Sequence, residues 1–110
     1  YAPLQTPEIC QAAVKRTGIA IRYIKNQTEE LCLAAVKSDG DALKFIKRQT
    51  PMMCRAAIKQ NRYAINYIID ETIIMELLTE NWTMIKYIKD IPITDKMLIG
   101  VVKGILRIPD

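Results

Sequence analysis

The sequence predicts an all-α fold, an α-solenoid of about 22-residue two-helix repeats. Three observations predict it. Nearly the same phrase occurs three times at a constant interval, starting at Gln5, Gln27 and Gln49. Apolar residues recur within each copy at helical spacing. The helices expected in each copy are also too short to be stable alone, because isolated helices below about 12 residues are marginal in water. Stacking copy on copy would bury the apolar faces.

The repeat divides the chain into consecutive copies of one domain. The phrases QTPEICQAAVK, QTEELCLAAVK and QTPMMCRAAIK open the first three copies, and WTMIKYIKD preserves a diverged fourth copy. The expected copies are 5–26, 27–48, 49–70, a diverged 71–92 and a half copy at 93–110. Residues 1–4 read as the tail of a preceding copy, so we expect a single helical-repeat domain, 1–110, that is a segment of a longer array.

A helix start opens each copy. Threonine stands before the first helix, where its hydroxyl can accept hydrogen bonds from unpaired backbone N–H groups. The threonines are Thr6, Thr28, Thr50 and Thr94. Pro7 and Pro51 follow at the first helical position, where a missing N–H costs nothing. The first helix should then bury an apolar stripe, which in the first copy is Ile9, Cys10, Ala13 and Val14.

A turn and a second helix complete each copy. Gly18 and Gly40 fit a left-handed residue between the two helices, and Asn61 is expected to take this role in the third copy. The second helix is expected to bury its apolar residues against the neighbouring copies. In the first copy these are Ala20, Ile21, Tyr23 and Ile24.

The three cysteines occupy one position in successive copies. Neighbouring layers of packed helices lie on the order of 10 Å apart, whereas a disulfide needs Cα atoms within about 7 Å. Cys10, Cys32 and Cys54 are therefore expected to be buried free thiols in a reducing, intracellular compartment. One thiol per layer, without a histidine or a CxxC pair, does not make a metal site.

The phrase C-x-A-A-V-K, followed by a glycine and then A-I/L-x-Y/F-I-K, resembles the repeats of domain of unknown function 4116. The resemblance covers residues 5–70 well, 71–103 loosely and 104–110 poorly. It implies a helical-repeat architecture. It also implies a viral or host-interacting context, since such arrays look typical of giant viruses of amoebae and some amoeba-associated bacteria. The localisation implied is then the host cytoplasm or the virion. The resemblance brings no catalytic residues.

Enzymatic chemistry has little support in the sequence. There is no histidine, which is the usual general base and metal ligand. Ser38 is the only serine, and it stands in a turn beside Asp39 without a base partner. We therefore expect no catalysis, no cofactor, no metal and no small-molecule substrate. No apolar run approaches the roughly 20 residues of a membrane span.

Columns of lysines leave an alternative function open. A regular basic ridge could track phosphates, so nucleic-acid or anionic-surface binding is possible. The lysines are Lys15, Lys37, Lys59, Lys25, Lys47 and Lys89. Cations in a last helical turn also complement the helix dipole, and this produces the same pattern without any partner. The net charge of +4 comes from two of the copies and does not run along the chain.

An aromatic column admits two interpretations. It consists of Tyr1, Tyr23, Phe45, Tyr67 and Tyr87. Exposed rings would form a platform on which bases stack. The rings lie between apolar neighbours such as Ile24 and Ile46. A ladder within the core is therefore the favoured interpretation.

Partner choice is expected to fall to solvent-facing positions that differ between copies, because the recurring positions would hold the scaffold. Aromatic residues at such positions are often interface anchors. The predicted partner-binding residues are Gln11, Leu33, Arg55, Ile19, Asp41, Tyr63, Arg22, Lys44, Asn66 and Trp82. The main hypothesis is a non-enzymatic scaffold that binds another protein or assembles with copies of itself.

Overall fold

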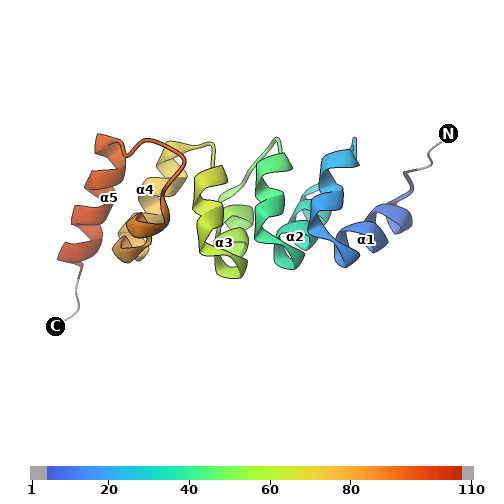
Figure 1. Cartoon of the computed structure of the whole chain (residues 1–110), viewed down its shortest axis with the longest axis horizontal. Coiled ribbons are helices and arrows are strands. Elements are labelled where there is room, and N and C mark those ends of the chain that lie inside the picture. Colours follow the sequence, from blue (N-terminus) through green and yellow to red (C-terminus); the bar gives the residue numbers. More distant parts are fainter. Residues whose placement is uncertain (1–4, 108–110) are drawn as a thin grey trace.

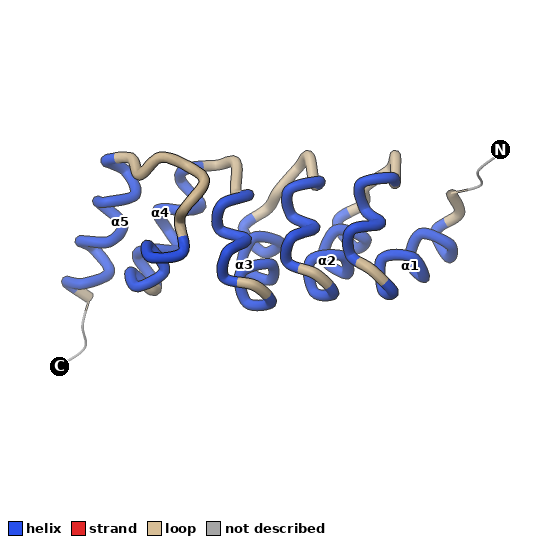
Figure 2. The backbone as a smooth tube through the Cα atoms, viewed as in Figure 1, coloured by secondary structure: helices blue, strands red, loops and turns tan. Residues whose placement is uncertain are grey.

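The computed structural model describes residues 5–107, and helices are the only regular secondary structure in that range. Helices joined by short loops make up the described chain (Figure 2). Longer α-helices alternate in it with short 3₁₀-helices. The α-helices are α1 (Pro7–Arg16), α2 (Glu29–Ser38), α3 (Pro51–Gln60), α4 (Glu71–Glu80) and α5 (Asp95–Leu106). The 3₁₀-helices are η1 (Gly18–Tyr23), η2 (Gly40–Phe45), η3 (Arg62–Tyr67) and η4 (Trp82–Tyr87). The all-α prediction is confirmed.

The helices follow one another along an elongated molecule of 56 × 28 × 17 Å, with α1 and α5 at opposite ends (Figure 1). Consecutive helices pack against each other: α2 contacts both α1 and α3, and η2 contacts both η1 and η3. The 3₁₀-helices η1, η2 and η4 also pack on the α-helix that follows each of them. One apolar core therefore extends through successive helices, from Cys10 in α1 to Met97 in α5.

The four threonines form the helix starts that the sequence predicts. Each side-chain oxygen accepts a hydrogen bond from the N–H three residues later, at 3.2–3.3 Å. Helix α4 begins differently, since Asp70 is its cap and accepts from the N–H of Thr72 at 2.8 Å. These caps satisfy N–H groups that the first turn of a helix leaves unpaired.

The second helices have 3₁₀ geometry, which the sequence analysis does not specify. In the first copy the buried residues recur every three positions, at Gly18, Ile21 and Ile24. A 3₁₀-helix has three residues per turn, so residues at this spacing lie on one side. Tyr23 does not lie on that side of the helix, and it is 70% exposed. The expectation that Tyr23 is buried is therefore wrong.

The expected left-handed glycines are also wrong. No residue in the described range 5–107 has a positive φ. A Cβ on Gly18 would lie 2.2 Å from the carbonyl oxygen of Ala35, and one on Gly40 would lie 2.5 Å from that of Ala57. Glycine is needed there because the next α-helix approaches the backbone closely. Asn61 has a different role, since it caps η3 by accepting from the N–H of Tyr63 at 3.1 Å.

The packing changes between α3 and α4. The constant interval that separates the starts of α1, α2 and α3 would start α4 at position 73, but α4 starts earlier, at Glu71. Helices α3 and α4 barely touch, while α4 and α5 form the most extensive helix pair. A Cβ on Gly100 would lie 2.5 Å from the carbonyl oxygen of Met75, so glycine permits this close approach of α5 to α4.

The cysteines lie where the sequence analysis expects them. Cys10, Cys32 and Cys54 are 5%, 1% and 0% exposed, and all three are free thiols. They belong to the continuous core beneath α1, α2 and α3. Their shared position in the repeat therefore corresponds to a shared packing position.

Candidate interaction surface

Glutamines at the start of the copies tie neighbouring 3₁₀-helices together. The Nε2 of Gln27 donates to the carbonyl oxygens of Ile21 and Phe45 at 3.1 and 3.0 Å. Its Oε1 accepts from the N–H of Lys47 at 3.2 Å. Gln49 makes the same three bonds one copy later, to Leu43, Tyr67 and Ile69. These recurring amides are fully used inside the molecule and are not available to a partner.

Asn66 has the same bridging role, although the sequence analysis predicts it to be a solvent-facing partner-binding residue. It is 8% exposed and is the buried polar residue of the described core. Its Nδ2 donates to the carbonyl oxygens of Tyr63 and Tyr87, both at 2.9 Å. Its Oδ1 accepts from the N–H groups of Lys89 and Asp90 at 2.7 and 3.0 Å. The prediction for Asn66 is therefore wrong.

The physical reason lies in the shortened fourth copy. A glutamine at the next position of the repeat would be residue 71, which is Glu71. Asn66 reaches from η3 to the end of η4 and replaces the missing amide. The sequence contains a signal for this replacement. Asn66 stands where the first two copies have Arg22 and Lys44, and it occurs just before the copy that lacks the glutamine.

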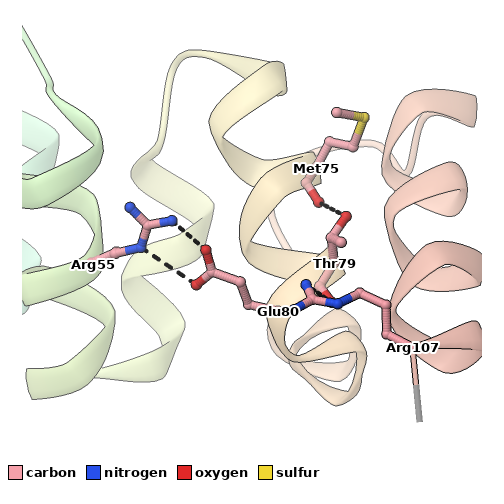
Figure 3. Close-up of polar contacts among 5 residues, drawn as sticks. All are labelled: Arg55, Met75, Thr79, Glu80 and Arg107. Carbon is pink, nitrogen blue, oxygen red and sulfur yellow. Dashed lines mark hydrogen bonds and ion pairs between the residues drawn. The ribbon is translucent and has the colours of Figure 1, made fainter. Parts of the chain in front are cut away.

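The predicted residues on the first helices differ in accessibility. Gln11 is half-buried and lines a cavity of about 540 Å³ between α1 and α2. Leu33 is half-buried against the core. Arg55 is exposed and forms an ion pair with Glu80 (Figure 3), its Nε lying 3.4 Å from a carboxylate oxygen. This pair spans the weakly packed junction between α3 and α4.

The residues predicted at the turns between helices also differ in how accessible they are. Ile19 packs against the core. Asp41 is half-buried and accepts a hydrogen bond from the Nδ2 of Asn61 at 2.9 Å. Tyr63 is 45% exposed, and its ring meets that of Tyr87 edge to face with centroids 5.2 Å apart. Only Tyr63 presents a large accessible side chain.

Arg22 and Lys44 lie between the aromatic rings of successive copies. The guanidinium of Arg22 is 5.2 Å from the ring centroid of Tyr23 and 4.8 Å from that of Phe45. The ammonium of Lys44 is 5.2 Å from Phe45 and 5.5 Å from Tyr67. We call this alternating set the cation–aromatic ladder. Such contacts are favourable because the ring face is electronegative.

The interpretation of the aromatic column as a core feature holds only in part. Tyr23 is exposed, whereas Phe45, Tyr67 and Tyr87 are half-buried and pack against the core. Tyr1 lies outside the described residues. Arg22 lies between the rings of Tyr23 and Phe45, and Lys44 lies between those of Phe45 and Tyr67. In these two gaps a cation therefore occupies the place that a stacked base would need.

Trp82, the remaining predicted anchor, begins η4 and is 40% exposed. Helix α5 covers it in part, since a Cβ on Gly104 would lie 3.0 Å from the Cβ of Trp82. Trp82 and Tyr63 are thus the accessible aromatic side chains among the predicted set.

All six predicted anion-binding lysines are exposed. Lys15, Lys37 and Lys59 lie in the last turns of α1, α2 and α3, as dipole matching also predicts. Lys25 and Lys47 follow the 3₁₀-helices, and the ammonium of Lys89 lies 4.8 Å from the ring centroid of Tyr63.

The buried thiols are poorly suited to nucleophilic chemistry. Burial raises the pKa of Cys54 to about 11, and the negative charge of Asp70 adds to this effect. Burial also raises the pKa of Cys32, helped by Glu29. A nucleophilic cysteine needs a lowered pKa. Among residues 5–107, no three histidine, cysteine or carboxylate side chains gather as a metal site would require.

The family comparison agrees with the repeated phrase. Residues 28–72 match the model of the family described as Domain of unknown function (DUF4116). This match confirms the resemblance. The matched stretch runs from the cap of α2 to the first turn of α4, so it includes Gln49 with its three partners. It includes Asn66 but not Tyr87, Lys89 and Asp90, to which Asn66 bonds.

No curated protein and no solved structure matches this chain. None of the described helices has the length and apolar character needed to cross a membrane.

Proposed function

We propose that the chain is a non-enzymatic α-solenoid scaffold that binds a protein partner through the exposed side chains that vary between copies. The observation that supports this proposal is that the recurring residues and the varying residues make different kinds of contact. The recurring threonines and glutamines bond within the molecule, whereas Arg22, Lys44, Arg55, Tyr63 and Trp82 remain exposed and differ from copy to copy. A constant framework with a variable surface is the arrangement by which stacked repeats recognise partners.

Tyr63 and Trp82 are the proposed anchors of this surface. Tyrosine and tryptophan are enriched among residues that dominate binding energy, because they bury a large area at a small entropic cost. Their backbones are already ordered by the caps Asn61 and Asn81, which precede η3 and η4. This local order would lower the entropic cost of binding a partner at these two positions. The family resemblance supports a viral or host-interacting context, and the buried free thiols support a reducing, intracellular compartment.

The test is partner capture followed by a direct affinity measurement. Extracts of the native cell would be passed over the wild-type chain and over the Tyr63→Ala/Trp82→Ala variant, and retained proteins identified by mass spectrometry. A protein retained only by the wild type would then be purified. We expect the variant to bind it at least about 10-fold more weakly in calorimetry, because each anchor typically contributes more than about 1 kcal/mol.

A matched control is Ile69→Ala, since Ile69 is 73% exposed and lies outside the proposed anchors. This variant should bind like the wild type. Equal retention of every protein by the wild type and by the double variant would contradict the proposed surface.

A second candidate function is binding of a nucleic acid or another anionic surface through the six lysines. It is favoured by their accessibility: the ion pair found among residues 5–107 is Arg55–Glu80, so the lysine charges are not neutralised by carboxylates there. Phosphate-driven binding falls steeply with salt. A gel shift that disappears between about 50 and 200 mM salt, ~10³-fold weaker binding, would support it. No shift at low salt would exclude it.

A further inference from the structure

Positive charge is concentrated on the 3₁₀-helices. The five α-helices of the described chain contain seven basic and seven acidic residues, so their charges balance. The 3₁₀-helices contain one acidic residue, Asp41, and four basic residues, Arg22, Lys44, Arg62 and Lys86. Asp41 is half-buried and accepts a hydrogen bond from a side-chain amide at 2.9 Å, whereas the four basic residues are exposed. The exposed charges of the 3₁₀-helices are therefore positive.

These four basic residues, which we call the cation row, follow one another along the molecule because successive 3₁₀-helices pack side by side. Arg22 and Lys44 belong to the cation–aromatic ladder. Arg62 continues the row, since its Nη1 donates to the hydroxyl of Tyr87 at 3.4 Å and its guanidinium lies 5.7 Å from the centroid of that ring. The ammonium of Lys86 lies 5.3 Å from the same ring centroid. Each 3₁₀-helix thus presents one exposed cation that is held against an aromatic ring.

The ring contacts leave most N–H groups of the cation row free to bond a ligand. A lysine ammonium has three donors and a guanidinium has five, and a ring face engages few of them. Among residues 5–107 the ion pair is Arg55–Glu80, and neither residue belongs to the row. The row therefore lacks carboxylate partners within the described chain. Its long side chains are already held by the rings, which lowers the entropic cost of binding a ligand.

The spacing of the cation row favours one ligand geometry. Packed layers of helices are about 10 Å apart, so the row presents roughly one cation per 10 Å. Arg22 lies 5.2 and 4.8 Å from the ring centroids of two successive layers, which agrees with this separation. A polyproline II peptide has three residues per turn and rises about 3.1 Å per residue, so every third side chain lies on one side, about 9 Å from the next. Such a peptide could place one carboxylate on each cation without bending.

A nucleic acid fits the cation row less well. Duplex DNA carries one negative charge per about 1.7 Å of its axis, so one cation per 10 Å would leave most phosphates unpaired. Single strands are commonly bound by stacking bases on aromatic rings. In the ladder, Arg22 and Lys44 already occupy the gaps between rings. The observations therefore favour a peptide.

From this arrangement we infer that the cation row binds an extended acidic segment of the partner protein, with a carboxylate at every third residue. The inference deepens the proposed function and rests on it, because it names the chemistry of the partner that the scaffold holds. Guanidinium–carboxylate pairs can be bidentate, so Arg22 and Arg62 fix the register of the bound segment.

Fluorescence anisotropy with a labelled model peptide tests this inference. The probe is four repeats of Glu-Pro-Pro, which adopts polyproline II and has glutamate at every third position. One ligand control replaces each glutamate by glutamine, and another has the same composition with its four glutamates adjacent. We expect the wild-type chain to bind the probe at low salt, to bind the clustered peptide several-fold more weakly and not to bind the neutral peptide.

Matched variants locate the binding. Arg22→Gln/Lys44→Gln should weaken binding of the probe about 10-fold, because each exposed charge pair is worth a factor of up to about five. Lys15→Gln/Lys37→Gln removes the same charge from the same two copies, but in the last turns of α1 and α2, and should bind like the wild type. All four side chains are exposed, so the folds should survive, which circular dichroism can verify.

Other outcomes overturn the inference. Equal weakening by the two double variants, or equal affinity for the spaced and the clustered peptide, would indicate attraction by net charge alone. A labelled single-stranded oligothymidine that binds more tightly than the probe, and is lost with Arg22→Gln/Lys44→Gln, would assign the row to nucleic acid. No binding of the probe would exclude the acidic segment, while the anchors Tyr63 and Trp82 would still be judged by the capture experiment.

Discussion

At the residue scale, side-chain amides hold successive 3₁₀-helices together. Gln27 and Gln49 each join the end of one 3₁₀-helix to the end of the next, and Asn66 continues the series. Each amide satisfies backbone groups that a short helix leaves without partners. A buried amide with both donor and acceptor bonded also specifies the register of the neighbouring copies, because a shift by one residue would break all of its bonds.

Replacing Gln49 by alanine should therefore be costly. The carbonyl oxygens of Leu43 and Tyr67 and the N–H of Ile69 would lose their partner. We expect the free energy of unfolding to fall by about 2–3 kcal/mol, since each unpaired buried group costs about 1–3 kcal/mol and water can compensate some of them. Urea denaturation would measure it. Gln11→Ala is the control, and a loss as small as that of the control would contradict the bridging role.

Two predictions for single residues, Asn66 and Tyr23, are wrong for reasons that concern their immediate surroundings. The sequence analysis groups Asn66 with Arg22 and Lys44 because the three share a position in the repeat. Burial of Asn66 depends on the backbone of Tyr87 and Lys89 in the following copy, which no local pattern encodes. Apolar neighbours predict a buried Tyr23, but the 3₁₀ geometry turns it outward.

At the scale of elements, the spacing of apolar residues selects two kinds of helix. The first helices bury residues at intervals of three and four, as in Cys10 and Val14, which suits 3.6 residues per turn. The second helices and their C-caps contain buried residues three positions apart, as in Leu43 and the C-cap Ile46, which suits three residues per turn. Ala42 and Ala64 are buried beside this series. Glycine at the start of the second helix then admits the next α-helix at close range.

Substitutions at Gly40 can separate steric from conformational roles. The residue has no positive φ, so its role is to leave space beside the carbonyl oxygen of Ala57. We expect Gly40→Ala to lower the free energy of unfolding by about 2 kcal/mol or more, as overpacking does. Gly40→Asn should cost more still, because asparagine is larger.

Thermal denaturation would rank these Gly40 variants. A left-handed glycine would give the opposite order, since asparagine tolerates that conformation better than alanine does. Arg62→Ala serves as the control, because Arg62 fills the equivalent position of the third copy and is exposed. Its replacement should change stability little.

At the scale of the whole molecule, the packing is uneven along the long axis. Helices α1, α2 and α3 pack at a regular interval, and α4 and α5 form a second closely packed unit. Across the junction, α3 and α4 make little contact, and a small cavity of about 230 Å³ lies between them. The exposed Arg55–Glu80 pair contributes little there, because surface ion pairs are worth about 0–1 kcal/mol. The Asn66 bridge is therefore the main polar tie between the two units.

Replacing Asn66 by alanine should loosen this junction selectively. The N–H groups of Lys89 and Asp90 would lose their acceptor, so hydrogen exchange at residues 84–90 should become faster, by roughly 10-fold if one to two kcal/mol of local stability is lost. Exchange at residues 18–46 should not change. Mass spectrometry of peptides would resolve the two regions, with Asn26→Ala as the control. Equal acceleration along the whole chain would argue against a junction.

The order of the amino acids is enough to predict the all-α class, the constant repeat interval, the threonine caps and the buried thiols. These depend on local chemistry and on spacing, which are written within each copy. The steric role of Gly18 and Gly40, the burial of Asn66 and the exposure of Tyr23 become visible only once the helices are packed together. Each of these depends on how closely a neighbouring copy approaches, and that distance is set by packing between residues that lie far apart in the chain, such as Gly18 and Ala35 or Asn66 and Asp90.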